Sequence, residues 1–134
     1  MRRIFITLLA ACIGLAGSAT STGAGLFSAT GAVIAILAGD LFVGEAEGHL
    51  GGAGTLAIRS QKNPALTCTG QFTSSAAGGS GRMHCSDGAT ATFQFQRLNA
   101  FRGYGTGNFS RGSMTFAYGF THGEALPYLK LPEG

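Results

Sequence analysis

Three side chains that could bind a metal ion alternate along one predicted strand. Glu45, Glu47 and His49 are separated by single residues, so an extended chain would place all three on one face. Carboxylate and imidazole groups are ligands for divalent metals, which makes this face a candidate metal site. Half-buried antiparallel strands produce the same alternation routinely, here with Ala46 and Gly48 facing inward. Because no cysteine or second histidine lies nearby in the sequence, we interpret the three residues as the solvent side of a hairpin.

Other residues capable of chemistry lack the partners that a reaction needs. His84 shares a predicted strand face with Arg82, and His122 lies near Glu124, but the spacing fixes no nucleophile beside either histidine. The alternating glycines of residues 103–107 look like a phosphate-binding loop, but no helix follows them. We therefore interpret them as strand glycines, and we predict a non-enzymatic protein with no catalytic residues and no cofactor.

The chain has three cysteines, of which Cys68 and Cys85 lie symmetrically about a loop at Ala76 and Ala77. Opposed cysteines on neighbouring strands can reach disulfide geometry, so we predict a bond between these two. The register that opposes them also separates the two faces of the hairpin, with Gly70, Phe72, Gly81 and Met83 beside the cysteines and Thr67, Thr69, Gln71, Arg82, His84 and Ser86 opposite. The alternative is two buried cysteines that act as small apolar side chains.

The N-terminus has the anatomy of a secretion signal: Arg2 and Arg3, a short apolar run from Ile4 to Leu9, and then small residues. The sequence Leu9-Ala10-Ala11-Cys12 resembles the lipobox of bacterial lipoproteins, which implies cleavage before Cys12 and acylation of its thiol. An odd cysteine count in an exported protein supports this assignment, because Cys12 remains when the other two pair.

Two alternatives to the lipid anchor remain open. An ordinary signal peptide would be cleaved after Ala19 and would discard Cys12. An uncleaved anchor is the third possibility, although the apolar run from Ile4 to Leu15 is shorter than the roughly 20 residues that span a bilayer. We predict a lipoprotein-type signal peptide at 1–11, a tether of Gly, Ala, Ser and Thr at 12–31 and a glycine-rich β domain at 32–134.

Composition and turn signals predict an all-β fold. Charged residues are 11% of the chain and glycine accounts for 23 of 134 residues, against usual values of about 25% and 7%. No segment beyond residue 40 has a long helical period. We expect a small antiparallel meander of about 7–8 short strands, forming a curled sheet or barrel. The predicted strands are 33–38, 41–48, 54–59, 66–72, 81–85, 91–97, 103–109 and 114–120.

Gly103, Gly105 and Gly107 alternate along one of these strands. Bare glycine surface in a sheet is a place where the aromatic rings of neighbouring strands can lie. We expect rings to occupy it, and the candidates are Phe93, Phe95, Phe116 and Tyr118.

Residues 66–95 and the aromatic C-terminal strand resemble a family of small, exported, glycine-rich bacterial proteins of uncharacterised function. The motifs that carry the resemblance are C-x-G-x-F at Cys68–Phe72 and G-x-G-x-x-x-C-x-D-G at Gly79–Gly88. The resemblance implies a fold and an exported location but no activity. Residues 70–88 also resemble a MORN-repeat hairpin, through their glycines, Phe72 and Asp87.

These observations predict a cell-envelope lipoprotein with a structural or protein-binding role. Its partners would be a membrane, through the lipid on Cys12, and other envelope proteins. We expect it in the periplasm, anchored preferentially to the outer membrane, or secreted. Without Arg2 and Arg3 the chain has seven basic and six acidic residues, scattered along it, so we exclude nucleic acid. The alternative is a small-ligand or metal-binding module at the barrel mouth, which a lined cavity would favour.

Overall fold

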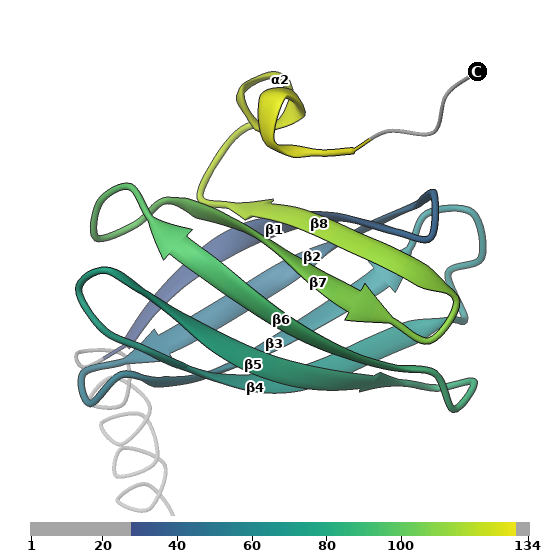
Figure 1. Ribbon diagram of the computed structural model, residues 1–134, viewed down its shortest axis with the longest axis horizontal. Coiled ribbons are helices and arrows are strands. Elements are labelled where there is room, and N and C mark those ends of the chain that lie inside the picture. The colour runs from purple at the N-terminus through teal and green to yellow at the C-terminus, as the bar shows by residue number, and fades with distance from the viewer. Residues whose placement is uncertain (1–27, 131–134) are drawn as a thin grey trace, which may run out of the picture.

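Eight antiparallel strands close into a barrel in residues 28–130, the part of the chain that this computed structural model describes (Figure 1). Each strand pairs with the next along the chain, and β8 pairs with β1 to close the sheet. The all-β meander predicted from the sequence is therefore confirmed as a barrel. The strands are β1 (Ser28–Leu37), β2 (Asp40–His49), β3 (Ala53–Ser60), β4 (Thr67–Ser74), β5 (Gly78–Cys85), β6 (Thr90–Arg97), β7 (Gly103–Phe109) and β8 (Gly112–Tyr118).

The first strand begins earlier than the sequence predicts. Residues 28–31, which we assigned to the tether, belong to β1 and pair with residues 46–49 of β2. Small residues form these backbone hydrogen bonds without burying large side chains, so their composition resembles that of a linker. The predicted signal peptide, Cys12 and the rest of the predicted tether lie outside the described residues.

The predicted register of the β4–β5 hairpin is confirmed. Cys68 lies opposite Cys85 and Phe72 opposite Gly81, as the separation of polar and apolar residues requires. The next turn places Gly88 in the left-handed region, at a φ of 93°, which glycine adopts at no steric cost. Every inward-facing position of the following strand is set by this turn.

The two ends of the barrel differ in the turns that form them. The start of β1 lies at one end, together with the turns at residues 50–52, 75–77 and 98–102 (left in Figure 1). We call this the mouth end. The other turns, at residues 38–39, 61–66, 86–89 and 110–111, form the far end.

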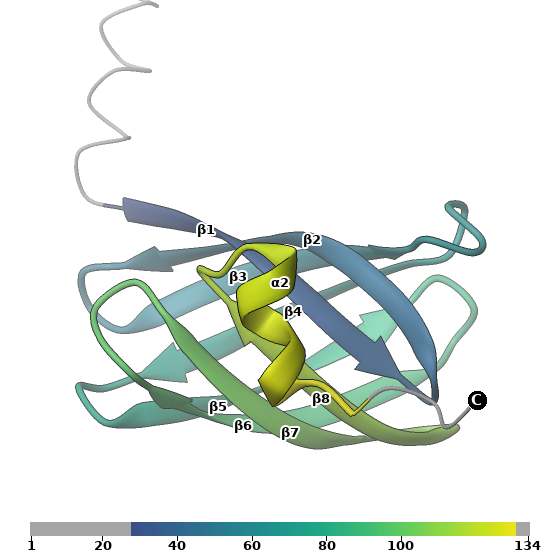
Figure 2. The ribbon, with the colours of Figure 1, turned by 90° about the horizontal axis from the view of Figure 1, so that it is seen from above.

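A short helical segment follows β8 and lies against the outside of the barrel (Figure 2). It consists of α2 (His122–Ala125) and the 3-10 helix η3 (Leu126–Tyr128). Ala125 is buried in a cluster with Ile34 of β1 and Ala117 of β8. We did not predict this helix, because one turn is too short to have a helical period. In residues 28–130, helices are too short to cross a membrane.

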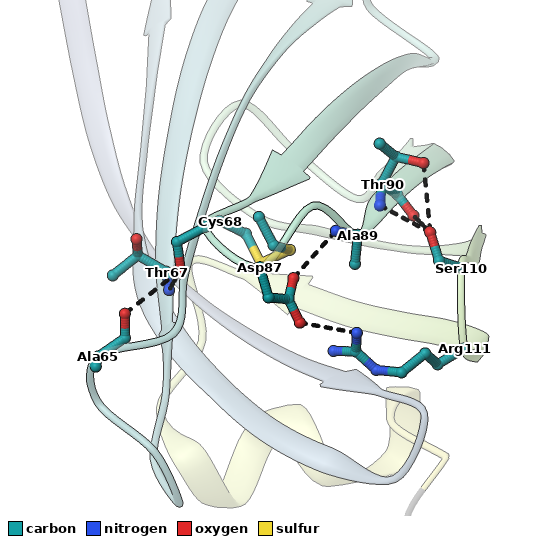
Figure 3. The surroundings of a disulfide bond; sticks show 10 residues. Ala65, Thr67, Cys68, Asp87, Ala89, Thr90, Ser110 and Arg111 are labelled. Carbon is teal, nitrogen blue, oxygen red and sulfur yellow. Dashed lines mark hydrogen bonds and ion pairs between the residues drawn. A yellow bond between two sulfur atoms is a disulfide. The ribbon is translucent and has the colours of Figure 1, made fainter.

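The predicted disulfide is confirmed at the far end, where Cys68 and Cys85 are bonded with their Cα atoms 3.9 Å apart (Figure 3). The turn beside it is held by Asp87, whose carboxylate accepts hydrogen bonds from the Ala89 backbone N–H at 3.0 Å and from Arg111 at 2.8 Å. These bonds, chiefly the one from Ala89, lower the pKa of Asp87 below its ordinary value.

Removing the disulfide should destabilise the barrel. The bond joins residues 17 positions apart, and closing a loop of that size is worth about 3 kcal/mol in the chain-entropy model. We expect the Cys68→Ser/Cys85→Ser variant to lose about 2–5 kcal/mol of unfolding free energy, measured by urea denaturation. The Cys12→Ser variant is the control and should unfold like the native chain. An equal loss in both variants would contradict the prediction.

Candidate functional site

The barrel interior is built from aromatic rings that lie over glycines of neighbouring strands. A Cβ atom added to Gly105 would overlap the Phe116 ring, and one added to Gly103 would overlap the Tyr118 ring. The expectation that rings cover the glycines of β7 is therefore confirmed. The absence of these Cβ atoms lets each ring tilt across the neighbouring strand instead of pointing straight into the barrel.

The rings contact one another edge to face. Phe93 lies 5.3 Å from Phe116, and Phe95 lies 5.8 Å from both Phe72 and Tyr118, between ring centroids. These interplanar angles are between 79° and 89°, which is the T-shaped geometry that aromatic pairs prefer. The network fixes the orientation of the rings and forms a rigid aromatic wall.

The interior is filled at the far end and hollow at the mouth end. Leu37, Phe42 and Met114 are buried near the far end, together with the disulfide. Toward the mouth a cavity of about 340 Å³ remains, and it opens between the turns of that end. Its lining is largely apolar. The larger apolar and aromatic side chains are Val33, Leu56, Phe72, Phe93, Phe95, Phe116 and Tyr118, with Leu50 and Phe101 from the mouth turns.

Arg97 brings a positive charge to the mouth of this cavity. Phe93, Phe95 and Arg97 occupy alternate positions of β6, and all three line the cavity. The Arg97 guanidinium donates to the carbonyl oxygen of Ser75 at 3.1 Å and to that of Ala100 at 2.9 Å. These bonds use two of the five N–H donors of an arginine. They fix the charge at the rim and leave donors for a bound group.

Tyr118 adds a hydroxyl to the cavity wall near Arg97. Burial raises the pKa of Tyr118 above its ordinary value, and the positive charge of Arg97 opposes this effect. The hydroxyl therefore stays protonated at neutral pH and can donate a hydrogen bond. Arg97 and Tyr118 give the mouth polar character while the deeper cavity stays apolar.

Sequence analysis did not assign Arg97 to the cavity, although its position could have been found. The inward alternation of Phe93 and Phe95, extended by two residues, reaches Arg97. From the sequence we described the arginines beyond Arg3 only as scattered along the chain.

The candidate metal ligands lie on the outside of β2, beside this mouth. Ala46 and Gly48 line the cavity, so the alternation with Glu45 and Glu47 is as predicted. His49 Nε2 lies 3.9 Å from Glu47 Oε1, and its ring reaches the cavity rim. Within residues 28–130, no three side chains of His, Cys, Asp or Glu gather in a way that could hold a metal ion.

Ser74, His49 and Glu47 also lie at the mouth. Serine, histidine and glutamate are the residue types of an acyl-transfer triad. The Ser74 hydroxyl donates to the carbonyl oxygen of Gly52 at 3.3 Å, and His49 faces Glu47. No hydrogen bond joins Ser74 to His49 in the described part of the chain, so the nucleophile–base pair that a triad needs is not formed. His84 and His122 are exposed and do not line this cavity.

A second hollow, of about 720 Å³, lies against β3 to β6. Its lining alternates between inward residues such as Met83 and outward residues such as Arg82 and Thr92. Residues from both faces of the sheet therefore contribute to this hollow, so no single face of the sheet encloses it. The mouth cavity, enclosed by inward side chains of several strands, is the better candidate site.

Comparison of the chain with protein-family models, curated proteins and solved structures finds no match in any of the three. The resemblance to small exported bacterial proteins and the MORN-like hairpin stay predictions. The geometry itself defines the class as an eight-stranded up-and-down barrel that is filled at one end and hollow at the other.

Proposed function

We propose that this protein binds one small, largely apolar ligand in the mouth cavity. The observation that carries the proposal is the apolar cavity of about 340 Å³ with Arg97 at its rim, the one arginine or lysine among the described residues that line it. Ligand pockets in proteins have volumes of about 300–1,000 Å³ and few polar groups. An eight-stranded barrel is just wide enough to be filled by side chains or to hold one small ligand. Here the far half is filled and the mouth half is open.

The apolar wall makes a ligand a better occupant of the cavity than water. A water molecule inside a protein needs two to four polar partners, and the deeper wall consists of Val33, Leu56 and aromatic rings. A hydrocarbon or aromatic group would bury its surface against these side chains, which is worth about 25 cal/mol per Å². The edge-to-face ring contacts hold the cavity shape before a ligand enters.

The arrangement of charge supports an amphipathic ligand. Arg97 and Tyr118 lie toward the mouth, and the apolar side chains continue inward. A ligand with an acidic or acceptor group at one end would enter with its apolar end first and leave the polar end beside Arg97. This placement keeps the charged group near water, where desolvation costs least.

We also propose an exported location in the cell envelope and a role without catalysis, as the sequence predicts. The signal-like N-terminus and the lipobox at Cys12 support an exported envelope protein with a lipid anchor. We propose binding without catalysis, because Ser74 and His49 form no nucleophile–base pair at the mouth.

A structural or protein-binding role is the second proposal. The exposed Leu50 and Phe101 support it, since apolar side chains at loop tips are suited to contact surfaces.

Filling the cavity should abolish ligand binding. Ala46 faces the cavity, whereas Ala57 on the adjacent strand β3 is exposed. We expect Ala46→Phe to weaken binding of a fluorescent probe such as anilinonaphthalene sulfonate at least tenfold, because the new ring occupies the ligand volume. The matched control Ala57→Phe should bind like the native protein, with circular dichroism verifying the fold of both. Equal affinity of the two variants would exclude the cavity as the binding site.

Arg97 should set a preference for acidic ligands. We expect dodecanoate to bind more tightly than dodecanol by about fivefold or more, since a charge-assisted hydrogen bond contributes about 1.5–3 kcal/mol. Arg97→Gln should remove most of this preference, and Arg97→Lys should restore part of it. Competition against the fluorescent probe measures both affinities. If Arg97→Gln leaves the ratio of the two affinities unchanged, another group must recognise the polar end.

Cys12 should carry the lipid. In protein expressed with its own N-terminus in a bacterium that processes lipoproteins, we expect a mature chain that begins at acylated Cys12. Labelling with an alkynyl fatty acid and intact-mass measurement would detect the acyl group, and Cys12→Ser should remove the label. A mature N-terminus at Thr20 would instead establish ordinary signal cleavage after Ala19.

A further inference from the structure

We propose that the mouth end of the barrel docks on a lipid bilayer through the apolar side chains of two loop tips. The tips are Leu50 in the β2–β3 turn and Leu98 and Phe101 in the β6–β7 loop. They are 85%, 50% and 69% exposed, respectively. The other large, strongly exposed apolar side chain in residues 28–130 is Leu126, at 51%, on η3 outside the barrel wall. Large exposed apolar side chains therefore concentrate at one end of the molecule.

Hydrogen bonds fix the backbone of the loop that carries Phe101. The Asn99 side-chain oxygen accepts hydrogen bonds from the backbone N–H of Phe101 at 2.8 Å and of Arg102 at 3.0 Å. The N–H of Leu98 donates to the carbonyl oxygen of Arg102 at 2.8 Å, which closes the base of the loop. Arg97 ties the same loop to the β4–β5 turn through Ala100 and Ser75. These bonds fix the backbone of the loop that carries Phe101, a residue that is exposed at the cavity rim.

The charges of the two ends support a lipid partner. The three mouth turns, at residues 50–52, 75–77 and 98–102, contain no acidic residue. Glu47 lies beside this end on the outer face of β2, with its Oε1 3.9 Å from His49 Nε2. Arg97 and Arg102 flank the β6–β7 tip, which places positive charge where anionic headgroups would lie. By contrast, the far-end turns contain Lys62, Asp87 and Arg111 and no strongly exposed large apolar side chain among the described residues. Apolar tips flanked by arginines are suited to the boundary between headgroups and acyl chains.

The chain also enters the barrel at this end. β1 begins at Ser28, at the mouth, and the preceding sequence has no charged residue from position 4 to position 27. Cys12, the predicted site of acylation, stands 16 positions before Ser28. Whether a lipid or the apolar run from Ile4 to Leu15 contacts the membrane, it joins the barrel beside the exposed tips and not at the charged far end.

Leu50 and Phe101 also line the rim of the cavity, whereas Leu98 does not. The docking surface does not depend on the cavity holding a ligand, since all three side chains are exposed to solvent. If both proposals hold, an amphiphile dissolved in the bilayer would reach the cavity at the membrane surface, without passing through bulk water.

A depth-quenching experiment on the full chain tests the orientation. The protein contains no tryptophan, so Phe101→Trp introduces a single reporter at the proposed tip. Leu126→Trp introduces a matched reporter at an exposed apolar position on the barrel side. Both variants keep the native N-terminus, so any anchor is common to them. Each would be reconstituted in vesicles of phosphatidylethanolamine and phosphatidylglycerol, with and without lipids brominated on the acyl chains.

We expect brominated lipid to quench the Phe101→Trp emission at least threefold more strongly than the Leu126→Trp emission, with a blue shift only in the former. Equal quenching of the two reporters, stronger quenching at position 126, or no quenching at either would overturn the proposal. The last outcome includes the case in which another protein covers the tips.

A charge variant separates this proposal from ligand binding. The Leu98→Asp variant should weaken quenching of the Phe101→Trp reporter in the same loop, while Leu126→Asp should leave it unchanged. The fluorescent probe should still bind the cavity when either Asp substitution is made in the native chain, since neither Leu98 nor Leu126 lines it. A concentration-dependent dimer of the native chain that Leu98→Asp abolishes would assign the tips to a second copy and overturn the proposal.

Discussion

The packing of aromatic rings against glycine is the interaction on which the rest of this structure depends. An eight-stranded barrel has a narrow interior, and a full ring on every inward position would not fit. The chain places glycine beside several of these rings: Gly105 beside Phe116, Gly103 beside Tyr118 and Gly54 beside Phe72. A shift of one residue in any of these registers would turn the rings to solvent and the polar side chains inward. The glycines contribute to the register together with the aromatic residues, because a Cβ atom in their place would overlap the rings.

The same packing explains why the barrel is solid at one end and hollow at the other. Near the far end, flexible or compact side chains such as Met83, Met114 and the bonded cysteines fill the interior. Toward the mouth, rigid rings lean over glycine and contact one another by their edges. Edge-to-face rings form a wall but do not fill the space in front of it. The cavity is thus a consequence of where glycine and phenylalanine stand in the sequence.

The sequence predicted the central hairpins better than the ends of the fold. Around Cys68 and Cys85 the alternation of polar and apolar residues allows one register, and the structure has that register. The start of β1 could not be predicted, because residues 28–31 are small and pair through the backbone alone.

The helix after β8 was missed, although Thr121 and Glu124 form a capping box, with the Thr121 N–H donating to Glu124 at 3.1 Å. That motif is visible in the sequence. The closure of β1 on β8 was left open between a curled sheet and a barrel, since pairing between distant strands leaves no local signal.

The even number of strands has a consequence for the mouth. In an up-and-down barrel of eight strands, the first strand begins and the last strand ends at the same end, so both terminal segments meet the mouth. The C-terminal segment turns away at Gly119, which has a φ of 79° and packs so closely on the Phe101 backbone that a Cβ would overlap it. It then runs back along the outside of the barrel, where the Lys130 N–H donates to the Thr115 hydroxyl at 2.9 Å. Because of this reversal, the described C-terminal residues do not cover the cavity, and Gly119 supports the loop that carries Phe101. The residues that turn the C-terminal segment away from the mouth therefore also support the neighbouring loop of the mouth, which carries Phe101.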